Sequence, residues 1–193
     1  MRLGIFGGTF DPPHVGHLLA ASDARDALGL DRLLFIPARS QPLKDERAQA
    51  SPAQRLEMTR LMAGSGGPFE VDPIEMERVG LSYTVDTLAA FADRFPDAHR
   101  YFLIGGDLVG QLPKWRSPER IASLAELVVL QRVGGDGDGS EHESSPYPMV
   151  RIPTRRVDVS STEIRARVRA DKPIRGFVTD AVAEYILSAG LYR

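Results

Sequence analysis

The chain has 193 residues, of which 42% are hydrophobic and 26% charged, with a formal net charge of −2 at pH 7. This is an ordinary globular composition, and the near-balanced charge argues against general attraction to nucleic acid or an anionic membrane. The chain has no cysteine, which excludes disulfides, thiolate metal sites and a thiol nucleophile. No apolar run approaches the roughly 20 residues of a membrane span, and no signal-peptide pattern opens the sequence. We therefore expect one cytoplasmic domain over residues 1–193.

Residues 7–17, with the sequence GGTFDPPHVGH, form the first stretch with chemical character. They follow an apolar run, Leu3–Phe6, that predicts a strand, and they lead into a helical pattern. The two glycines permit a tight turn and the close approach of a ligand. Pro12–Pro13 fits the start and first turn of a helix, where a missing N–H costs little. A helix N-terminus at this point favours an anion.

Two histidines in this stretch, His14 and His17, are three residues apart and share one face of a helix. Imidazoles beside a helix N-terminus can donate hydrogen bonds to a phosphate with developing charge. Two other interpretations are a pair of structural histidines and a zinc site. Zinc needs a third ligand, and neither an H-E-x-x-H pattern nor a cysteine supplies one, so we expect no metal site built by the protein.

Short apolar runs and helical spacings alternate along the rest of the chain. Strands are predicted at Leu3–Phe6, Leu33–Ile36, Phe69–Val71, Tyr101–Ile104, Leu127–Leu130 and Met149–Ile152. Helices are predicted at 18–28, from Ser51–Pro52 to Gly64, at 85–95, from Ser117–Pro118, at 160–170, and from about 180 to Gly190. Ile74–Glu77 is expected to be an alternating extended segment, and Gly134–Pro148 a mobile surface loop.

This alternation predicts an α/β domain built around a parallel sheet. Ligands in such folds bind beyond the carboxyl ends of the strands. Three polar segments follow predicted strands, namely Gly7–His17, Ala38–Lys44 and Gly105–Asp107. We therefore expect the three to meet in one cleft.

Other segments carry candidate ligand-binding groups. Ser160–Arg165 offers helix N-terminal amides, hydroxyls and an arginine that could hold phosphate oxygens, or it is a well-capped surface helix. Trp115 is the only tryptophan and is either half-buried core or a stacking wall for an aromatic ligand. Tyr83–Thr84 opens a helix and could offer a ring and amides to a carboxylate, and Asp107 could accept from a ribose hydroxyl or cap a turn. Together these groups suggest phosphoryl or nucleotidyl transfer.

With these motifs, the chain resembles the bacterial nicotinate-mononucleotide adenylyltransferases, in the nucleotidyltransferase superfamily that carries the histidine–x–glycine–histidine signature. The matching segments are Gly7–His17, Ser51–Met58, Glu75–Leu88, Ile104–Trp115, Val159–Arg165 and Gly190–Tyr192. They cover essentially the whole chain in the right order. The resemblance implies a Rossmann-like, doubly wound parallel sheet with helices on both faces, with the C-terminal helices of about 160–193 packed on the nucleotide-binding core.

The resemblance also implies a reaction, in which ATP and nicotinate mononucleotide give nicotinate adenine dinucleotide and pyrophosphate, with Mg²⁺ expected. The acceptor's own phosphate attacks the α-phosphorus in line. The implied catalytic residues are His14, His17 and Arg165. The implied ATP-binding residues are those three with Gly7, Gly8, Thr9, Phe10, Gly105, Asp107, Ser161 and Thr162. The implied acceptor-binding residues are Lys44, Tyr83, Thr84, Trp115 and Arg116.

The sequence departs from the family pattern at two places in the acceptor region. The family's substrate-phosphate loop has Pro-Pro-His followed by Lys or Arg, whereas this chain has Gln41–Lys44, with leucine at the histidine position. Arg116 stands where an aromatic residue is common. The rival functions are adenylyl transfer to nicotinamide mononucleotide or phosphopantetheine, and non-catalytic nucleotide binding. RNA binding is disfavoured by the charge balance, and a homo-oligomer is left open.

Overall fold

A parallel sheet forms the centre of the computed structural model, which describes residues 1–40, 48–64, 68–132 and 145–193. In the described part the sheet has six strands, all parallel, in the order β3-β2-β1-β4-β5-β6. The strands are β1 Arg2–Gly8, β2 Arg32–Pro37, β3 Phe69–Val71, β4 His99–Gly105, β5 Glu126–Arg132 and β6 Met149–Thr154. Each predicted strand is confirmed, and the order is that of a doubly wound Rossmann-type sheet.

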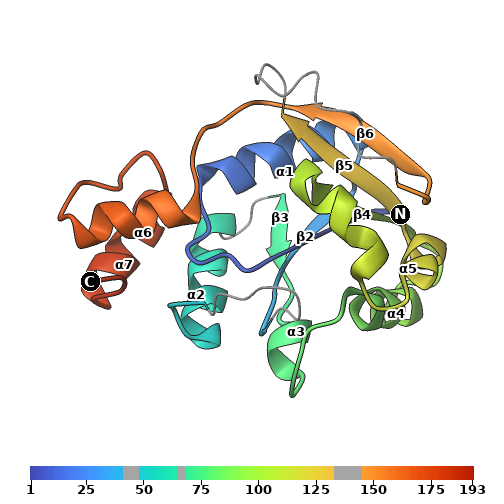
Figure 1. Ribbon diagram of the computed structural model, residues 1–193, viewed down its shortest axis with the longest axis horizontal. Coiled ribbons are helices and arrows are strands. Elements are labelled where there is room, and N and C mark those ends of the chain that lie inside the picture. The colour runs from blue at the N-terminus through green and yellow to red at the C-terminus, as the bar shows by residue number, and fades with distance from the viewer. Residues whose placement is uncertain (41–47, 65–67, 133–144) are drawn as a thin grey trace.

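Helices connect these strands and cover both faces of the sheet (Figure 1). They are α1 Val15–Leu28, α2 Pro52–Ala63, α3 Ile74–Glu77, α4 Thr84–Arg94, the 3₁₀ helix η1 Gly106–Lys114, α5 Pro118–Leu124, α6 Ser161–Arg169 and α7 Asp180–Ser188. The predicted capping box of α2 is confirmed, because Ser51 and Gln54 each bond the other's main-chain N–H. No helix in the described ranges is long and apolar enough to cross a membrane.

Alternate residues of β1, β2, β4 and β5 belong to two separate hydrophobic cores, as a sheet buried on both faces requires. On one face, Phe35, Leu103 and Val128 pack with residues of α1, α2, α6 and α7. On the other face, Ile5 and Phe102 pack with residues of α4, η1 and α5. The prediction of helices on both faces is confirmed, and the two cores hold the carboxyl ends of the strands in a fixed arrangement.

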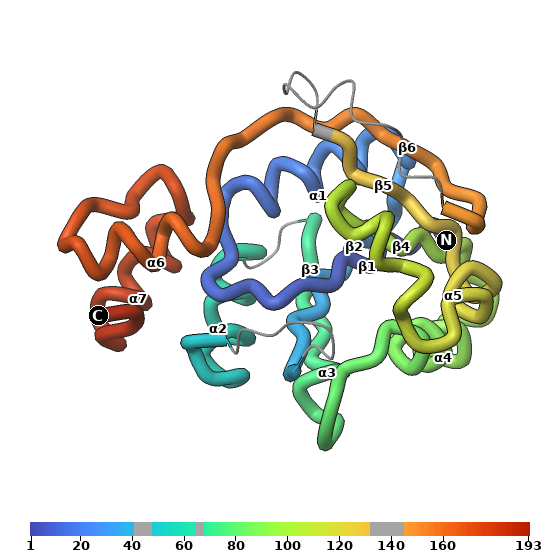
Figure 2. Tube along the Cα trace, in the orientation of Figure 1, coloured from blue at the N-terminus to red at the C-terminus, as the bar shows by residue number. Residues whose placement is uncertain are grey.

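The C-terminal helices α6 and α7 lie together beside α2, at the end of the molecule away from the N-terminus (Figure 1). Figure 2 shows the chain after β6 running along α1 before it enters α6. Along that path the main-chain N–H of Arg155 donates to Asp23 of α1 at 2.7 Å. The course of the chain thus brings α6 back to the start of α1.

Two predictions about local structure are wrong, and one falls outside the described residues. Ile74–Glu77 is a short helix and not an extended segment. The prediction failed because a run of four residues is too short to distinguish the period of a strand from that of an α-helix. Pro12–Pro13 lies before α1, because His14 takes the N-cap position and the helix begins at Val15. The loop predicted at Gly134–Pro148 lies mostly within 133–144, outside the described residues.

Candidate active site

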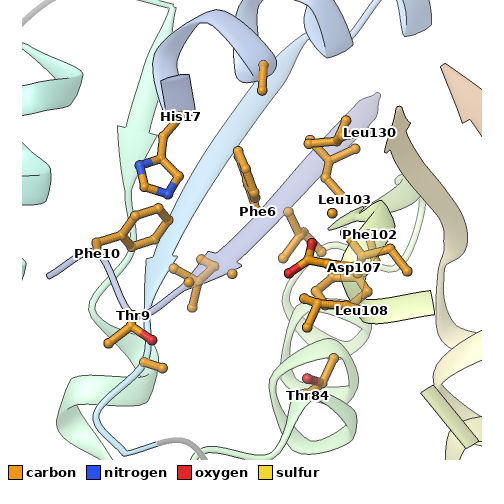
Figure 3. Close-up of a pocket in the computed structure, with 18 of the residues that line it drawn as sticks. Phe6, Thr9, Phe10, His17, Thr84, Phe102, Leu103, Asp107, Leu108 and Leu130 are labelled. Carbon is orange, nitrogen blue, oxygen red and sulfur yellow. The ribbon is translucent and has the colours of Figure 1, made fainter. Parts of the chain in front are cut away.

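A cavity of about 1230 Å³ opens at the carboxyl ends of β1 and β4, where the strand order of the sheet reverses direction. Ala38, at the end of β2, also lines it, so the described parts of the three predicted segments meet as expected. Figure 3 shows His17 and Phe10 on one side of the pocket and Asp107 and Leu108 on the other. The predicted site residues in its wall are Gly7, Gly8, Thr9, Phe10, His14, His17, Tyr83, Thr84, Gly105, Asp107, Trp115, Arg116, Ser161 and Thr162.

The two histidines of the opening motif stack at the N-terminus of α1, with ring centroids 3.7 Å apart. The main-chain N–H of His14 donates to Nδ1 of His17 at 3.1 Å. Because a main-chain N–H can only donate, this ring nitrogen must accept, and neutral His17 therefore carries its proton on Nε2. The helix cap thus also selects the tautomer of His17, a consequence that residue spacing alone does not reveal.

Close packing explains the small residues around this pair. A Cβ on Gly16 would lie 3.0 Å from Nδ1 of His14, so glycine lets that ring fold over the first turn. A Cβ on Gly8 would lie 2.8 Å from the ring of Phe10. Phe10 itself has a left-handed φ of 51°, and its ring packs edge-on against His17 at 4.9 Å. The plane of the His17 ring is therefore fixed by His14, which stacks on it, and by Phe10, which packs edge-on against it.

Asp11 holds this loop from behind, as a carboxylate that is only 4% exposed. It accepts from the N–H groups of Gln49 and Ala50 at 2.7 and 3.1 Å. It also accepts from the hydroxyl of Tyr192 at 2.8 Å. Burial, and after it the charge of Asp11, raises the pKa of Tyr192, so this hydroxyl remains a donor. The next-to-last residue of the chain is thus joined to the histidine motif.

Replacing Tyr192 with phenylalanine tests this connection, since only the hydroxyl is removed. A hydrogen bond to a buried carboxylate contributes about 1.5–3 kcal/mol, so we expect the free energy of unfolding to fall by about that amount. Urea denaturation measures it, with Tyr185→Phe on α7 as the matched control, expected to change little. An unchanged midpoint for Tyr192→Phe would contradict the connection.

Arg55 of α2 is a second internal brace, with 1% of its surface exposed. Its Nη1 donates to the carbonyls of Thr9 and Ala38 at 2.7 and 2.6 Å, and its Nη2 donates to the carbonyl of Arg39 at 2.9 Å. Burial lowers the pKa of its guanidinium, while the charge of Asp11 opposes the shift. One side chain therefore joins the motif loop to the segment that follows β2.

Helix α6 closes the same loop from the C-terminal side. The hydroxyl of Ser161 donates to the carbonyl of Pro12 at 2.8 Å. Arg165 donates from Nη1 to the carbonyl of Asp11 at 2.8 Å and from Nη2 to the Thr162 hydroxyl at 3.1 Å. Its Nε is buried and bonds no other described residue. Arg165 lies behind the loop and, unlike Ser161 and Thr162, is not in the cavity wall.

The far side of the cavity is aromatic and carries the start of α4. Trp115 is half-buried, with its ring edge-on to Phe102 at 6.0 Å. The guanidinium of Arg116 lies 4.7 Å above the ring of Tyr83 and 3.9 Å from the carboxylate of Asp86. Thr84 is the first residue of α4, where main-chain N–H groups have no partner within the helix. This half combines stacking surfaces with donors for an anion.

The end of β4 supplies the floor between the two halves. A Cβ on Gly105 would collide with the carboxylate of Asp107 in its present position, so glycine lets this cavity-lining side chain fold back over the end of β4. Lys44, predicted to bind the acceptor's phosphate, lies outside the described residues, as does the rest of Gln41–Lys44. Within the described ranges, no three His, Cys, Asp or Glu side chains gather as metal ligands.

Several residues of the cavity wall were missed by sequence reasoning. They include Glu75, Ser82, Thr87, Gln111 and Lys114. The last two belong to the 3₁₀ helix η1, for which no element was predicted because its period and length match neither a strand nor an α-helix. The first three belong to the matching segment Glu75–Leu88, but no periodicity or motif gave them a role.

Comparisons with known proteins agree with this geometry. Residues 5–167 match the sequence model of the cytidylyltransferase-like family. A probable nicotinate-nucleotide adenylyltransferase of Gemmatimonas aurantiaca is 53% identical over 100% of this chain and 93% of the relative. The nicotinate-nucleotide adenylyltransferase of Bacillus subtilis is 37% identical over 99% of this chain and 98% of the relative.

A solved structure has the same fold at low sequence identity. It is the Plasmodium falciparum nicotinic acid mononucleotide adenylyltransferase complexed with NaAD, which superposes with a TM-score of 0.80 at 19% identity over 99% of this chain and 97% of the other. The chain therefore belongs to the cytidylyltransferase-like family and, within it, to the nicotinate-nucleotide adenylyltransferases.

Proposed function

We propose that this chain transfers the adenylyl group of ATP to nicotinate mononucleotide, giving nicotinate adenine dinucleotide and pyrophosphate. The observation that carries the proposal is the two-part cavity, which has stacked histidines at one helix N-terminus and a tryptophan beside a second. Its volume exceeds that of ordinary single-ligand pockets, as two nucleotides require. Relatives that match along the full chain carry this activity in their names.

In this reaction an oxygen of the acceptor's phosphate attacks the α-phosphorus of ATP in line. A new P–O bond forms as the bond to the bridging oxygen breaks, and pyrophosphate leaves with that electron pair. No covalent enzyme intermediate is needed, so catalysis consists of positioning and charge stabilisation.

On the ATP side, His14 and His17 donate to phosphate oxygens, His17 through the Nε2 proton that its cap bond selects. Arg165 holds the loop that carries them and adds positive charge. The backbone turn and the start of α6 complete the nucleotide site. The residues proposed to line it are Gly7, Gly8, Thr9, Phe10, Gly105, Asp107, Ser161 and Thr162.

On the acceptor side, Trp115 and Tyr83 stack against the pyridine ring. The first N–H groups of α4, near Thr84, receive the nicotinate carboxylate, assisted by the helix dipole. Arg116, held over the Tyr83 ring, adds positive charge at the rim. Lys44 is proposed to contact the acceptor's phosphate.

Mg²⁺ is proposed to arrive as the complex with ATP, bound through phosphate oxygens and water. Its chemistry is to neutralise charge on the leaving pyrophosphate. We further propose that residues 1–193 act as one domain, with α6 and α7 completing the phosphate side. A cytoplasmic location remains a prediction of the sequence.

The test incubates the purified chain with ATP, Mg²⁺ and nicotinate mononucleotide, and separates the products by chromatography. Nicotinate adenine dinucleotide and pyrophosphate are expected in equal amounts, and neither without the acceptor. Formation of ADP and phosphate would contradict the proposal. So would a yield of product no higher than that of the His17→Ala variant.

A further inference from the structure

One buried carboxylate in the acceptor half has no part in the proposed reaction. Glu75 lies on the short helix α3, is 7% exposed, and lines the cavity. Carboxylates are rarely so buried without hydrogen-bond partners, and at this position a negative charge would face a negatively charged acceptor. The contacts of Glu75 indicate what it does there.

One hydroxyl donates to this carboxylate and a second lies near it, on either side of Tyr83–Thr84. Thr87 donates from Oγ1 to Oε1 of Glu75 at 2.8 Å. The nearby hydroxyl of Ser82 also lowers the pKa of the Glu75 carboxyl. Because these two residues flank Tyr83–Thr84, Glu75 joins both ends of the segment that starts α4.

The same two hydroxyls accept from other donors, and the proton of the Thr87 hydroxyl is directed at Glu75. Oγ of Ser82 accepts from the N–H of Arg39 at 3.1 Å, while the N–H of Ser82 donates to the carbonyl of Ser40 at 2.8 Å. Oγ1 of Thr87 accepts from Arg78 at 3.0 Å. The network therefore runs from the end of β2, through Glu75, to the first turn of α4.

The charge state of Glu75 follows from opposed effects. Burial raises the pKa of the Glu75 carboxyl, while the hydroxyls of Thr87 and Ser82 and the charge of Arg78 oppose the shift. A carboxylate offers two acceptor oxygens, one of which accepts from Thr87. Glutamine has the same size but offers one oxygen, with an NH₂ donor in place of the other.

We propose that Glu75 is a positioning residue for acceptor selection, which holds the first N–H groups of α4 where an acceptor's carboxylate binds. This inference rests on the proposed function and deepens it. The carboxylate of a carboxylate-bearing pyridine nucleotide accepts hydrogen bonds from those N–H groups. A carboxamide analogue presents its own N–H₂ donors to them and gains less from their placement.

The experiment compares Glu75→Gln with the wild type and with Glu77→Gln, a matched control because Glu77 is exposed on the same helix. Trp115 is the only tryptophan and lies in the cavity wall, so its fluorescence reports acceptor binding without turnover. For Glu75→Gln we expect Kd and KM for nicotinate mononucleotide to rise roughly tenfold, with KM for ATP within about twofold of wild type. The preference for nicotinate over nicotinamide mononucleotide should fall by a similar factor.

Equal losses for ATP and both acceptors, or no change at all, would overturn the inference. Should Glu75→Gln fold poorly, Thr87→Val removes one donor at constant shape, and Thr87→Ser should restore the preference that Thr87→Val loses. Failure of the wild type to use nicotinate mononucleotide would overturn the proposed function itself. If the wild type is active but the Glu75 and Thr87 variants keep its preference for nicotinate over nicotinamide mononucleotide, only the role of Glu75 is overturned.

Discussion

Replacing His17 with alanine is expected to lower kcat by about 10²–10³, with ATP binding largely kept, by analogy with the loss of one transition-state donor. The reason is the bond from the His14 N–H, which puts the proton of neutral His17 on Nε2, where we propose that it donates to phosphate. Pyrophosphate release at saturating substrates measures kcat, and calorimetric titration with a non-hydrolysable ATP analogue measures binding.

Two further variants separate catalysis from helix capping. His17→Asn retains an acceptor for the His14 N–H, so it should recover stability without recovering turnover. His99→Ala is the control, because His99 is exposed at the opposite end of β4 and pairs with Glu126. An unchanged kcat in His17→Ala would remove this residue from the mechanism.

Replacing Arg165 with alanine is expected to lower kcat/KM for ATP by about 10²-fold. The variant loses two charge-assisted hydrogen bonds together with a positive charge behind the proposed phosphate site. Its guanidinium joins the carbonyl of Asp11 to the hydroxyl of Thr162. Arg165→Lys retains the charge but not the fork, so it should recover less than a tenth of the lost efficiency. Initial rates at varied ATP measure both variants.

Arg169 provides the matched control one turn further along α6, where it is exposed and bonds Gln49. Arg169→Ala should leave kcat/KM within about twofold of wild type, as expected for a surface position. Full recovery by Arg165→Lys would show that charge alone matters and that the bonds to the loop do not.

The architecture was largely predictable from the sequence because it depends on local patterns. Apolar runs such as Leu33–Ile36 and Leu127–Leu130 are buried strands, and capping residues such as Ser51 mark helix starts. The activity was predicted from motifs spread along the whole chain, and full-length relatives carry the same name. The individual roles of the site residues remain predictions.

The bracing of the site was not predictable, because it depends on contacts between distant residues. Tyr192 and Asp11 are 181 positions apart, and no pattern links them. Arg55 lies in α2 and is buried against three carbonyls, although arginine side chains are usually exposed. Glu75 falls in a four-residue helix that was predicted to be extended, so its position facing the cavity could not be foreseen.

The identity of the acceptor is the central claim, and one measurement tests it most directly. It is the ratio of kcat/KM for nicotinate mononucleotide to that for nicotinamide mononucleotide, measured with the purified chain at saturating ATP and Mg²⁺. Helix N-terminal donors facing a carboxylate predict a ratio of about 10² or more. A ratio near one, or a preference for nicotinamide mononucleotide, would contradict the assignment of the α4 N-terminus to a carboxylate-bearing acceptor.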